Sequence, residues 1–145
     1  MQITKGTIQY FDEVMGIFKS ARGEMTYLPQ LHTHEETKKF VLALLEKGIT
    51  FIALETEVMG FVCVENGWVE HLYVAPHFQG KGVGKELLDK AKRLSPAGLS
   101  LWVFEDNIDA IRFYEREGFQ LVKKRDIEEQ DNEEGLPDRL YKWKA

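Results

Sequence analysis

Cysteine, proline and long apolar segments are scarce in this sequence of 145 residues, which contains one cysteine and four prolines. The single cysteine, Cys63, has no partner for an internal disulfide, so a reducing, cytoplasmic setting is the default expectation. No apolar run approaches the roughly 20 residues of a membrane-spanning helix, and no N-terminal signal pattern is present. We therefore expect a soluble cytoplasmic protein without a membrane partner.

The sequence also lacks an excess of basic residues. Lysine and arginine number 19 against 24 aspartates and glutamates, which gives a formal net charge of −5. Proteins that bind nucleic acids usually carry a positive excess, so this balance argues against a nucleic-acid partner and mildly favours a cationic one. The length suits one domain over residues 1–145, and an apolar content of 43% is typical of a globular protein.

A glycine-rich stretch, Gln79–Lys85, follows an apolar strand-like run at Trp68–Val74 and opens a helical pattern at Val83–Leu94. The first N–H groups of a helix have no intrahelical partner and lie at the positive end of the helix dipole. Glycine allows positive φ and lets an anion approach without meeting a Cβ atom. Lys81 and Lys85 add positive charge at the same end. The stretch therefore predicts a phosphate-binding turn.

Two common phosphate-binding turns fit this spacing poorly. A P-loop needs Gly-x-x-x-x-Gly-Lys-[Ser/Thr], but Gln79 occupies the first position and Glu86 replaces the hydroxyl residue that would bind magnesium. A dinucleotide-binding turn needs Gly-x-Gly-x-x-Gly/Ala, and Leu87 stands at its third position. Asp106 lies at a suitable distance for the ribose-binding acid, so the case against this alternative depends mainly on Leu87.

A third pattern, Gln/Arg-x-x-Gly-x-Gly/Ala, is matched by Gln79, Gly82 and Gly84. The phrase Leu72-Tyr73-Val74-Ala75-Pro76 precedes it, and the segment Asn107–Phe119 follows it. In this order and at these distances, the three segments resemble the GNAT family of N-acetyltransferases, in its bacterial-type small-substrate branch. The resemblance covers most of the chain and is weakest at both ends.

The resemblance implies an α/β fold in one domain, with a central mixed, mostly antiparallel sheet, helices on both faces and a parallel strand pair that splays apart. It implies an acyltransferase that uses acetyl-CoA as co-substrate, without a metal. The acceptor would be a primary amine of a small molecule or peptide, which attacks the thioester directly in a ternary complex. A second interpretation is a sensor of this fold that binds coenzyme A without turnover. Many members of the family form homodimers.

The same resemblance places the coenzyme on the strand end, the glycine turn and the downstream helix. The N–H groups of about Gly80 to Lys85 would hold the diphosphate, and the main chain of Leu72 and Val74 would bind the arm. The N–H of Val74 would stabilise the thioester oxygen, and Asn107 would position the arm, cap its helix, or both. The expected cofactor-binding residues are Leu72, Tyr73, Val74, Gln79, Gly80, Lys81, Gly82, Val83, Gly84, Lys85, Asn107 and Tyr114.

Two residues are expected to carry the proton transfers. Deprotonating a lysine-like amine at pH 7 costs about 4.6 kcal/mol, so a base is needed, and Glu70 on the strand that leads to the thioester is the first choice. Tyr114 matches the family's tyrosine near the sulfur and would act as general acid. Their alternative roles are a surface charge for Glu70 and aromatic packing for Tyr114. The other candidate bases are Glu105, Asp106, His71 and His32.

The remaining reactive side chains carry weaker signals. Cys63 lies mid-strand, away from these segments, so a covalent acyl-cysteine route is disfavoured. The four histidines have neither a cysteine partner nor the spacing of a metal site, so we expect no metal. Glu133, Glu134 and Asp138, in the acidic segment before the last strand, would contact the amine if that segment overhangs the acceptor site; a solvated loop is the alternative.

Periodicity and turn signals predict the elements around these segments. Asn66-Gly67 predicts a type I′ hairpin between two strands, which also argues against a dinucleotide-binding domain. A capping box at Thr33 and Glu36 opens a helix that buries Phe40, Val41, Leu44 and Leu45. The predicted strands are Ile3–Tyr10, Thr50–Leu54, Val58–Val64, Trp68–Val74, Leu99–Phe104, Phe119–Lys123 and Asp138–Trp143; the other helices are Asp12–Arg22, Val83–Leu94 and Asn107–Tyr114.

Overall fold

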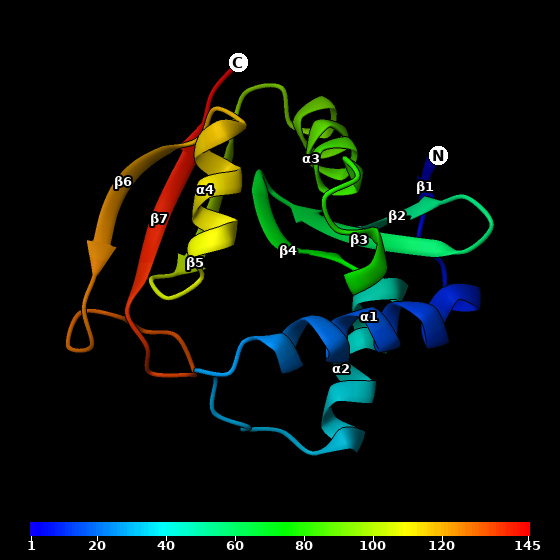
Figure 1. Cartoon of the computed structure of the whole chain (residues 1–145), viewed down its shortest axis with the longest axis horizontal. Coiled ribbons are helices and arrows are strands. Elements are labelled where there is room, and N and C mark those ends of the chain that lie inside the picture. Colours follow the sequence, from blue (N-terminus) through cyan, green and yellow to red (C-terminus); the bar gives the residue numbers. More distant parts are fainter.

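The computed structural model describes residues 1–145 and contains one seven-stranded sheet with helices on both sides (Figure 1). The strands are β1 (Gln2–Lys5), β2 (Thr50–Leu54), β3 (Val58–Glu65), β4 (Trp68–Val74), β5 (Leu99–Phe104), β6 (Gln120–Arg125) and β7 (Asp138–Trp143). The helices are α1 (Phe11–Glu24), α2 (His34–Glu46), α3 (Val83–Leu94) and α4 (Ile108–Arg116), with short 3-10 turns η1 (Ile8–Tyr10) and η2 (Pro76–Phe78). No helix has the length and apolar character that crossing a membrane requires.

The strands lie in the spatial order β1-β2-β3-β4-β5-β7-β6. β4 and β5 are parallel, and every other neighbouring pair is antiparallel. The β3–β4 hairpin turns at Asn66 and Gly67, whose φ values of 52° and 79° are those that a type I′ turn requires. The predicted mixed, mostly antiparallel sheet and the predicted hairpin are both confirmed.

β4 and β5 separate soon after they begin. Their only paired residues are Trp68 and Ser100, whereas β4 stays paired with β3 as far as Val74. The N–H of Ala75 donates to β3 at the carbonyl of Met59, so the alternation of the antiparallel ladder turns the main-chain groups of Val74 toward β5. The predicted splayed parallel pair is confirmed, and it leaves main-chain groups at the end of β4 facing the gap.

Different helix pairs cover the two faces of the sheet (Figure 1). α3 and α4 pack on one face around a core that contains Leu87 and Ile111, while α1 and α2 pack on the other around Val14 and Val41. Leu87, the residue that disfavours a dinucleotide-binding turn, lies 3.2 Å from where a Cβ of Gly60 would stand. The close approach of helix and sheet is thus provided by a glycine on β3 instead of one on the helix.

The first strand is shorter than its pattern predicts. A strand over Ile3–Tyr10 was expected, but β1 ends at Lys5 and the chain enters η1. The partner strand β2 begins at Thr50. The N–H of Gly6 still donates to the carbonyl of Thr50 at 2.8 Å, but no residue after Gly6 pairs with β2. The prediction is wrong because the length of a strand depends on its partner as well as on its own alternation.

α2 begins with the predicted capping box, because Thr33 and Glu36 each accept a hydrogen bond from the other's backbone N–H. One position on its predicted buried face is wrong. Val41 is fully buried, but the neighbouring Phe40 is 43% exposed, since it lies at the flank of the helix that lines a cavity rather than at its contact with the sheet.

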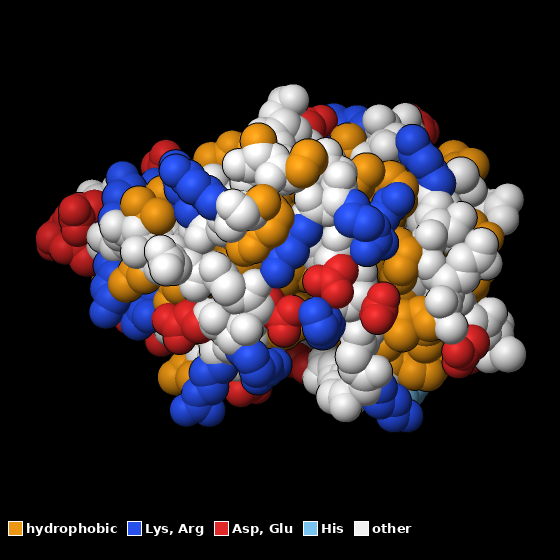
Figure 2. Space-filling model, turned by 90° about the horizontal axis from the view of Figure 1, so that it is seen from above, with side chains coloured by type: hydrophobic (Ala, Val, Ile, Leu, Met, Phe, Trp, Pro, Cys, Tyr) orange, Lys and Arg blue, Asp and Glu red, His pale blue; other side chains and the backbone are white.

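Figure 2 shows the side of the molecule that lies at the top of Figure 1. Lysine and arginine side chains are interspersed there with aspartate, glutamate and apolar side chains. No continuous field of one sign covers this side. This side therefore offers an anion no extended positive surface.

Candidate active site

The glycine turn before α3 has the open backbone that an anion requires. Gly80 and Gly82 have φ values of 75° and 82°, in the left-handed region that favours glycine. A Cβ built on either residue would meet no other atom within 4 Å. Gly84 faces α4 instead: a Cβ there would lie 3.4 Å from the ring of Phe113, which is ordinary contact.

The backbone N–H groups of residues 80 to 85 have no backbone partner. The first N–H to find one is that of Glu86, which donates to the carbonyl of Gly82 at 3.1 Å. Gly82 is the N-cap of α3, so these donors gather at the positive end of a helix. The turn therefore combines a row of free donors with open space in front of them.

The two lysines of the turn are not equally free. Lys85 Nζ donates to Asp89 Oδ2 at 3.2 Å and to Glu117 Oε1 at 3.3 Å, and these hydrogen bonds raise its pKa. Lys81 makes no ion pair and lies 5.8 Å from the centre of the Phe78 ring. Part of the positive charge that the sequence places here is thus already neutralised by local carboxylates.

Gln79 connects the turn to the end of β4. Its Nε2 donates to the carbonyl of Val74 at 3.2 Å. That carbonyl belongs to the part of β4 that faces the gap, so the glutamine holds the turn at a set distance from the splayed strands. Asn107 caps α4, because its Oδ1 accepts from the N–H of Ala110 at 3.4 Å. Its predicted capping contact is confirmed.

Two adjoining cavities meet at the splayed strands. The smaller, of about 710 Å³, is lined by the glycine turn, η2 and the start of α4. The larger, of about 1180 Å³, is lined by α1, α2, β4, β5 and the β6–β7 loop. The residues that line both are Met25, Leu72, Tyr73, Asn107, Ala110 and Tyr114. A ligand in one cavity would therefore meet a ligand in the other at this junction.

Tyr114 lies on α4 at the junction and is only 8% exposed. Its ring packs against Phe113 and Phe119, at centroid distances of 5.2 and 5.5 Å. Burial raises the pKa of its hydroxyl well above the usual range, and the nearby Tyr73 raises it further. The hydroxyl makes no hydrogen bond within the protein. Tyr114 therefore combines a packed ring with a hydroxyl that has no hydrogen-bond partner in the protein.

Glu70 lies on a β-bulge. His71 pairs with Cys63 and Val69 pairs with Val64, so Glu70 has no partner on β3. A bulge turns side chains away from the regular alternation, and here it leaves Glu70 in the wall of the larger cavity. Partial burial raises the pKa of its carboxyl; Glu65 adds to this and Lys47 opposes it. The side chain makes no ion pair.

The other candidate bases are less free. Glu105 accepts two hydrogen bonds of 2.6 Å from Arg139, which hold its pKa below the usual range. His32 is paired with Glu133 at 2.9 Å, which raises the pKa of the imidazole. His71 is partly buried among aromatic rings, and Asp106 lines the smaller cavity only. Among these candidate bases, Glu70 is the carboxylate that lines the larger cavity without a cationic partner. Glu36 lines the same cavity, but its carboxylate is engaged in the capping box of α2.

Two ion pairs attach the β6–β7 loop to the opposite wall of the larger cavity. The Glu134 side chain is 8% exposed and pairs with Arg22 of α1 at 3.0 Å, and Glu133 pairs with His32 at 2.9 Å. Figure 1 shows this loop beside the connection between α1 and α2. Residues of the acidic segment therefore line the cavity, but Glu134 is already paired with an arginine and Glu133 with a histidine.

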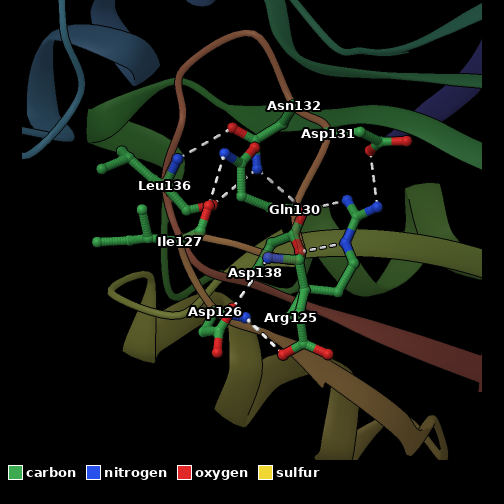
Figure 3. A network of polar contacts seen from close by, with 9 residues as sticks. Arg125, Asp126, Ile127, Gln130, Asp131, Asn132, Leu136 and Asp138 are labelled. Carbon is green, nitrogen blue, oxygen red and sulfur yellow. Dashed lines mark hydrogen bonds and ion pairs between the residues drawn. The ribbon is translucent and has the colours of Figure 1, made fainter.

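Asp138 is fully engaged within the same loop. It is 2% exposed and accepts from Arg125 at 2.8 and 2.6 Å, while Asn132 donates to it at 3.1 Å (Figure 3). Arg125 also bonds to Asp131 and stacks on Trp102, with 3.7 Å between the guanidinium carbon and the ring centroid. Asp138 therefore stabilises the loop, and both of its carboxylate oxygens are already hydrogen-bonded.

Sequence reasoning missed Tyr27, which lies between α1 and α2 and lines the smaller cavity. Its hydroxyl is buried without a hydrogen-bond partner, and its ring meets Phe104 edge-on at 6.1 Å. Burial raises its pKa to about 12, with a smaller contribution from Asp106. A buried hydroxyl without a partner is costly, and in a cavity wall it is a donor that a ligand can satisfy. No local sequence pattern marks this tyrosine.

The single cysteine is not placed to act as a nucleophile. Cys63 is buried in β3, 3.2 Å from the hydroxyl of Thr50, and burial raises its pKa to about 12. Because only the thiolate attacks readily, a thiol in this state is unreactive near neutral pH. The structure also contains no cluster of three or more side chains suited to hold a metal ion.

The burial of His71 leads to a testable pH effect. Burial lowers its pKa from 6.5 to about 4, so between these values the unfolded chain binds a proton that the folded protein does not. The histidine's contribution to stability is present above pH 6.5 and is lost as the pH falls toward 4, by about 2–3 kcal/mol.

We expect His71→Phe to remove this part of the acid sensitivity. Urea unfolding at pH 7 and pH 4.5 should show a smaller loss of stability in the variant than in the wild type. An equal loss in the two proteins would mean that His71 is not held uncharged.

The chain belongs to the acetyltransferase (GNAT) family, a family of acyltransferase enzymes, because the family model matches residues 13–119. It is 28% identical over 96 residues to the peptidyl-lysine N-acetyltransferase YjaB of Salmonella typhimurium, a match that spans 65% of this chain and 66% of that protein. For three such curated relatives, the matched stretches span 66%, 39% and 58% of their lengths.

Solved structures show the same fold. Apo YjaB of Escherichia coli superimposes with a TM-score of 0.77 at 22% identity, over 99% of this chain and 98% of that one. The PaiA N-acetyltransferase of Thermoplasma acidophilum, solved in complex with coenzyme A, gives a TM-score of 0.69 at 17% identity, over 99% and 98%. The expected family and fold class are both confirmed.

Proposed function

We propose that this protein is an acetyl-CoA-dependent N-acetyltransferase that transfers an acetyl group to a primary amine by direct attack in a ternary complex. The observation that carries the proposal is the row of free N–H groups before α3, which opens beside the splayed end of β4. One sheet spans the chain from β1 to β7, which supports a single catalytic domain over residues 1–145.

The smaller cavity suits coenzyme A in shape and chemistry. The diphosphate would lie against the N–H groups of residues 80 to 85, where Gly80 and Gly82 leave open space. The unpaired end of β4 would bind the amide-containing arm as a further strand does, through Leu72 and Val74. Tyr27 offers a buried hydroxyl that lacks a partner. A structural neighbour from Thermoplasma acidophilum was solved with coenzyme A bound.

The larger cavity would receive the amine. Acetyl-CoA would supply its thioester at the junction, where attack by a neutral amine nitrogen on the acetyl carbon would form the amide and release coenzyme A as the carbon–sulfur bond breaks. The N–H of Val74 would stabilise the oxygen as its charge develops. Glu70 would take the amine's proton directly or through water, and Tyr114 would give its hydroxyl proton to the departing thiolate. The family relative from Salmonella is named as a lysine-directed enzyme.

A titration with acetyl-CoA followed by a free-thiol assay over a panel of amines tests the proposal. We expect micromolar binding and release of thiol with at least one class of amine. Binding without thiol release from any amine would favour a coenzyme A sensor, and absence of binding would overturn the assignment of the glycine turn. NAD and ATP are the control ligands. In a thermal unfolding experiment acetyl-CoA should raise the melting temperature of the protein, and neither NAD nor ATP should.

We expect Glu70→Gln to lower kcat/KM about hundredfold, because general-base catalysis contributes about 10²- to 10⁴-fold. The raised pKa of Glu70 should appear as the acid limb of the pH profile in the wild type, and this limb should be absent in the variant. Glu65→Gln is the control, since Glu65 lies nearby on β3 but lines neither cavity. This variant should keep its maximal rate and its acid limb, with the limb moved to lower pH because Glu65 raises the pKa of Glu70. Equal rates for wild type and Glu70→Gln would remove Glu70 as the base.

A further inference from the structure

Four aromatic side chains meet in the larger cavity from three different elements. Phe18 comes from α1, Phe40 from α2, and His71 and Tyr73 from β4. Phe18 lies 5.7 Å from Phe40, 5.9 Å from His71 and 5.7 Å from Tyr73, measured between ring centroids. Phe40 and His71 are 5.4 Å apart, and His71 and Tyr73 are 6.0 Å apart. The rings form one continuous surface, here called the aromatic wall.

The aromatic wall faces the cavity, and all four of its residues line it. Phe18 is buried, but Phe40 is 43% exposed at the open end of the wall. A large apolar side chain left exposed inside a concave site is a usual mark of a surface that a ligand covers. Neither the glycine turn nor the proton transfers proposed above make use of Phe40 or Phe18.

The charges around the wall indicate what kind of group it would bind. Arg22 lies with its guanidinium carbon 5.7 Å from the centre of the Phe18 ring and is itself paired with Glu134. His71 is uncharged at neutral pH because burial lowers its pKa to about 4. The charge of Arg22 beside the Phe18 ring is thus offset by Glu134, and none of the four side chains of the wall is charged at neutral pH. The ring faces therefore suit an uncharged aromatic group by stacking, whereas a second cation on the same faces is the competing occupant that the experiment must distinguish.

The wall also lies next to the groups proposed to act on the amine. Glu70 immediately precedes His71, and Tyr73 belongs both to the wall and to the junction of the cavities. An amine held at the junction would thus have its attached group directed along β4 toward Phe18 and Phe40. We propose that the acceptor is an arylalkyl primary amine whose ring packs on the aromatic wall. This proposal depends on the acetyltransferase function proposed above.

The test uses 2-phenylethylamine and propylamine, which share an aliphatic primary amine and differ chiefly in the ring. Burying a phenyl group is worth about 1.5–3 kcal/mol, so we expect about a tenfold to hundredfold higher kcat/KM for 2-phenylethylamine. 1,4-Diaminobutane tests the competing occupant, because it would place a second cation on the ring faces. A higher kcat/KM for this diamine than for 2-phenylethylamine would overturn the proposal. Phe40→Ala should lower kcat/KM for 2-phenylethylamine about tenfold and change that for propylamine less than threefold.

Leu121→Ala is the control variant, because Leu121 is 42% exposed on β6 and lines neither cavity. Binding of 2-phenylethylamine to the coenzyme A complex, measured by calorimetry, separates the two proposals. If 2-phenylethylamine binds, Phe40→Ala weakens this binding and no acetyl group is transferred, the aromatic wall is supported as a binding surface and the enzymatic function is overturned. If both amines are acetylated at similar kcat/KM and Phe40→Ala affects both equally, the proposed role of the aromatic wall is overturned and the acetyltransferase function is retained.

Discussion

Replacing Gly82 with valine is expected to weaken coenzyme A binding at least about a hundredfold. The new side chain would enter the open space in front of the turn, where a Cβ now meets no atom within 4 Å. The φ of 82° also disfavours a β-branched residue, so the backbone would shift and carry its N–H groups with it. Loss of two hydrogen bonds to a charged group, at about 1.5–3 kcal/mol each, accounts for the expected change.

Gly48→Val is the matched control for this substitution. Gly48 has a φ of 74° after the end of α2, and a Cβ there would be 3.4 Å from the end of the Lys5 side chain, which is ordinary contact. Both variants should lose about 1–3 kcal/mol of stability from backbone strain, and only Gly82→Val should lose affinity in a calorimetric titration. Equal affinity in the two variants would show that the diphosphate does not lie at the turn.

The turn could be read from the sequence because its chemistry is local. Glycines, the preceding strand and the following helix are adjacent in the chain, and α3 begins at Val83 and β4 ends at Val74, as the pattern predicts. The splayed strands followed from the family resemblance. The first strand was misjudged because its length is set by Thr50, 44 positions after Gly6, which alternation cannot reveal.

The walls of the larger cavity were much less predictable. Arg22 and Glu134 are 112 positions apart, and Arg139 reaches Glu105 across 34 positions, so no local pattern announces either pair. These pairs decide which acidic residues remain free. Phe40 was assigned to the core because helical periodicity marks apolar faces without distinguishing a core from a cavity wall. A local pattern of residues can thus predict the turn proposed to bind coenzyme A, whereas the walls of the proposed acceptor cavity depend on long-range contacts.

Tyr114→Phe is expected to lower kcat about a hundredfold or more while leaving coenzyme A affinity within threefold. The substitution removes only the hydroxyl, which has no hydrogen-bond partner in the protein, and keeps the ring against Phe113 and Phe119. Since burial raises the pKa of Tyr114, the hydroxyl keeps its proton over the range in which amines of pKa about 10.4 begin to lose theirs. It can therefore hold that proton for the leaving thiolate.

If Tyr114 had a purely structural role, the expected result would differ. Removing a hydroxyl that has no hydrogen-bond partner would then change neither the rate nor the stability. Tyr141→Phe provides the contrast: the Tyr141 hydroxyl donates to Glu115 at 2.7 Å and accepts from Arg139 at 3.3 Å, outside both cavities. That variant should lose about 1–2 kcal/mol of stability and keep its rate. Tyr114→Phe should keep the wild-type melting temperature and have a lower kcat. A wild-type kcat in this variant would show that another group protonates the thiolate.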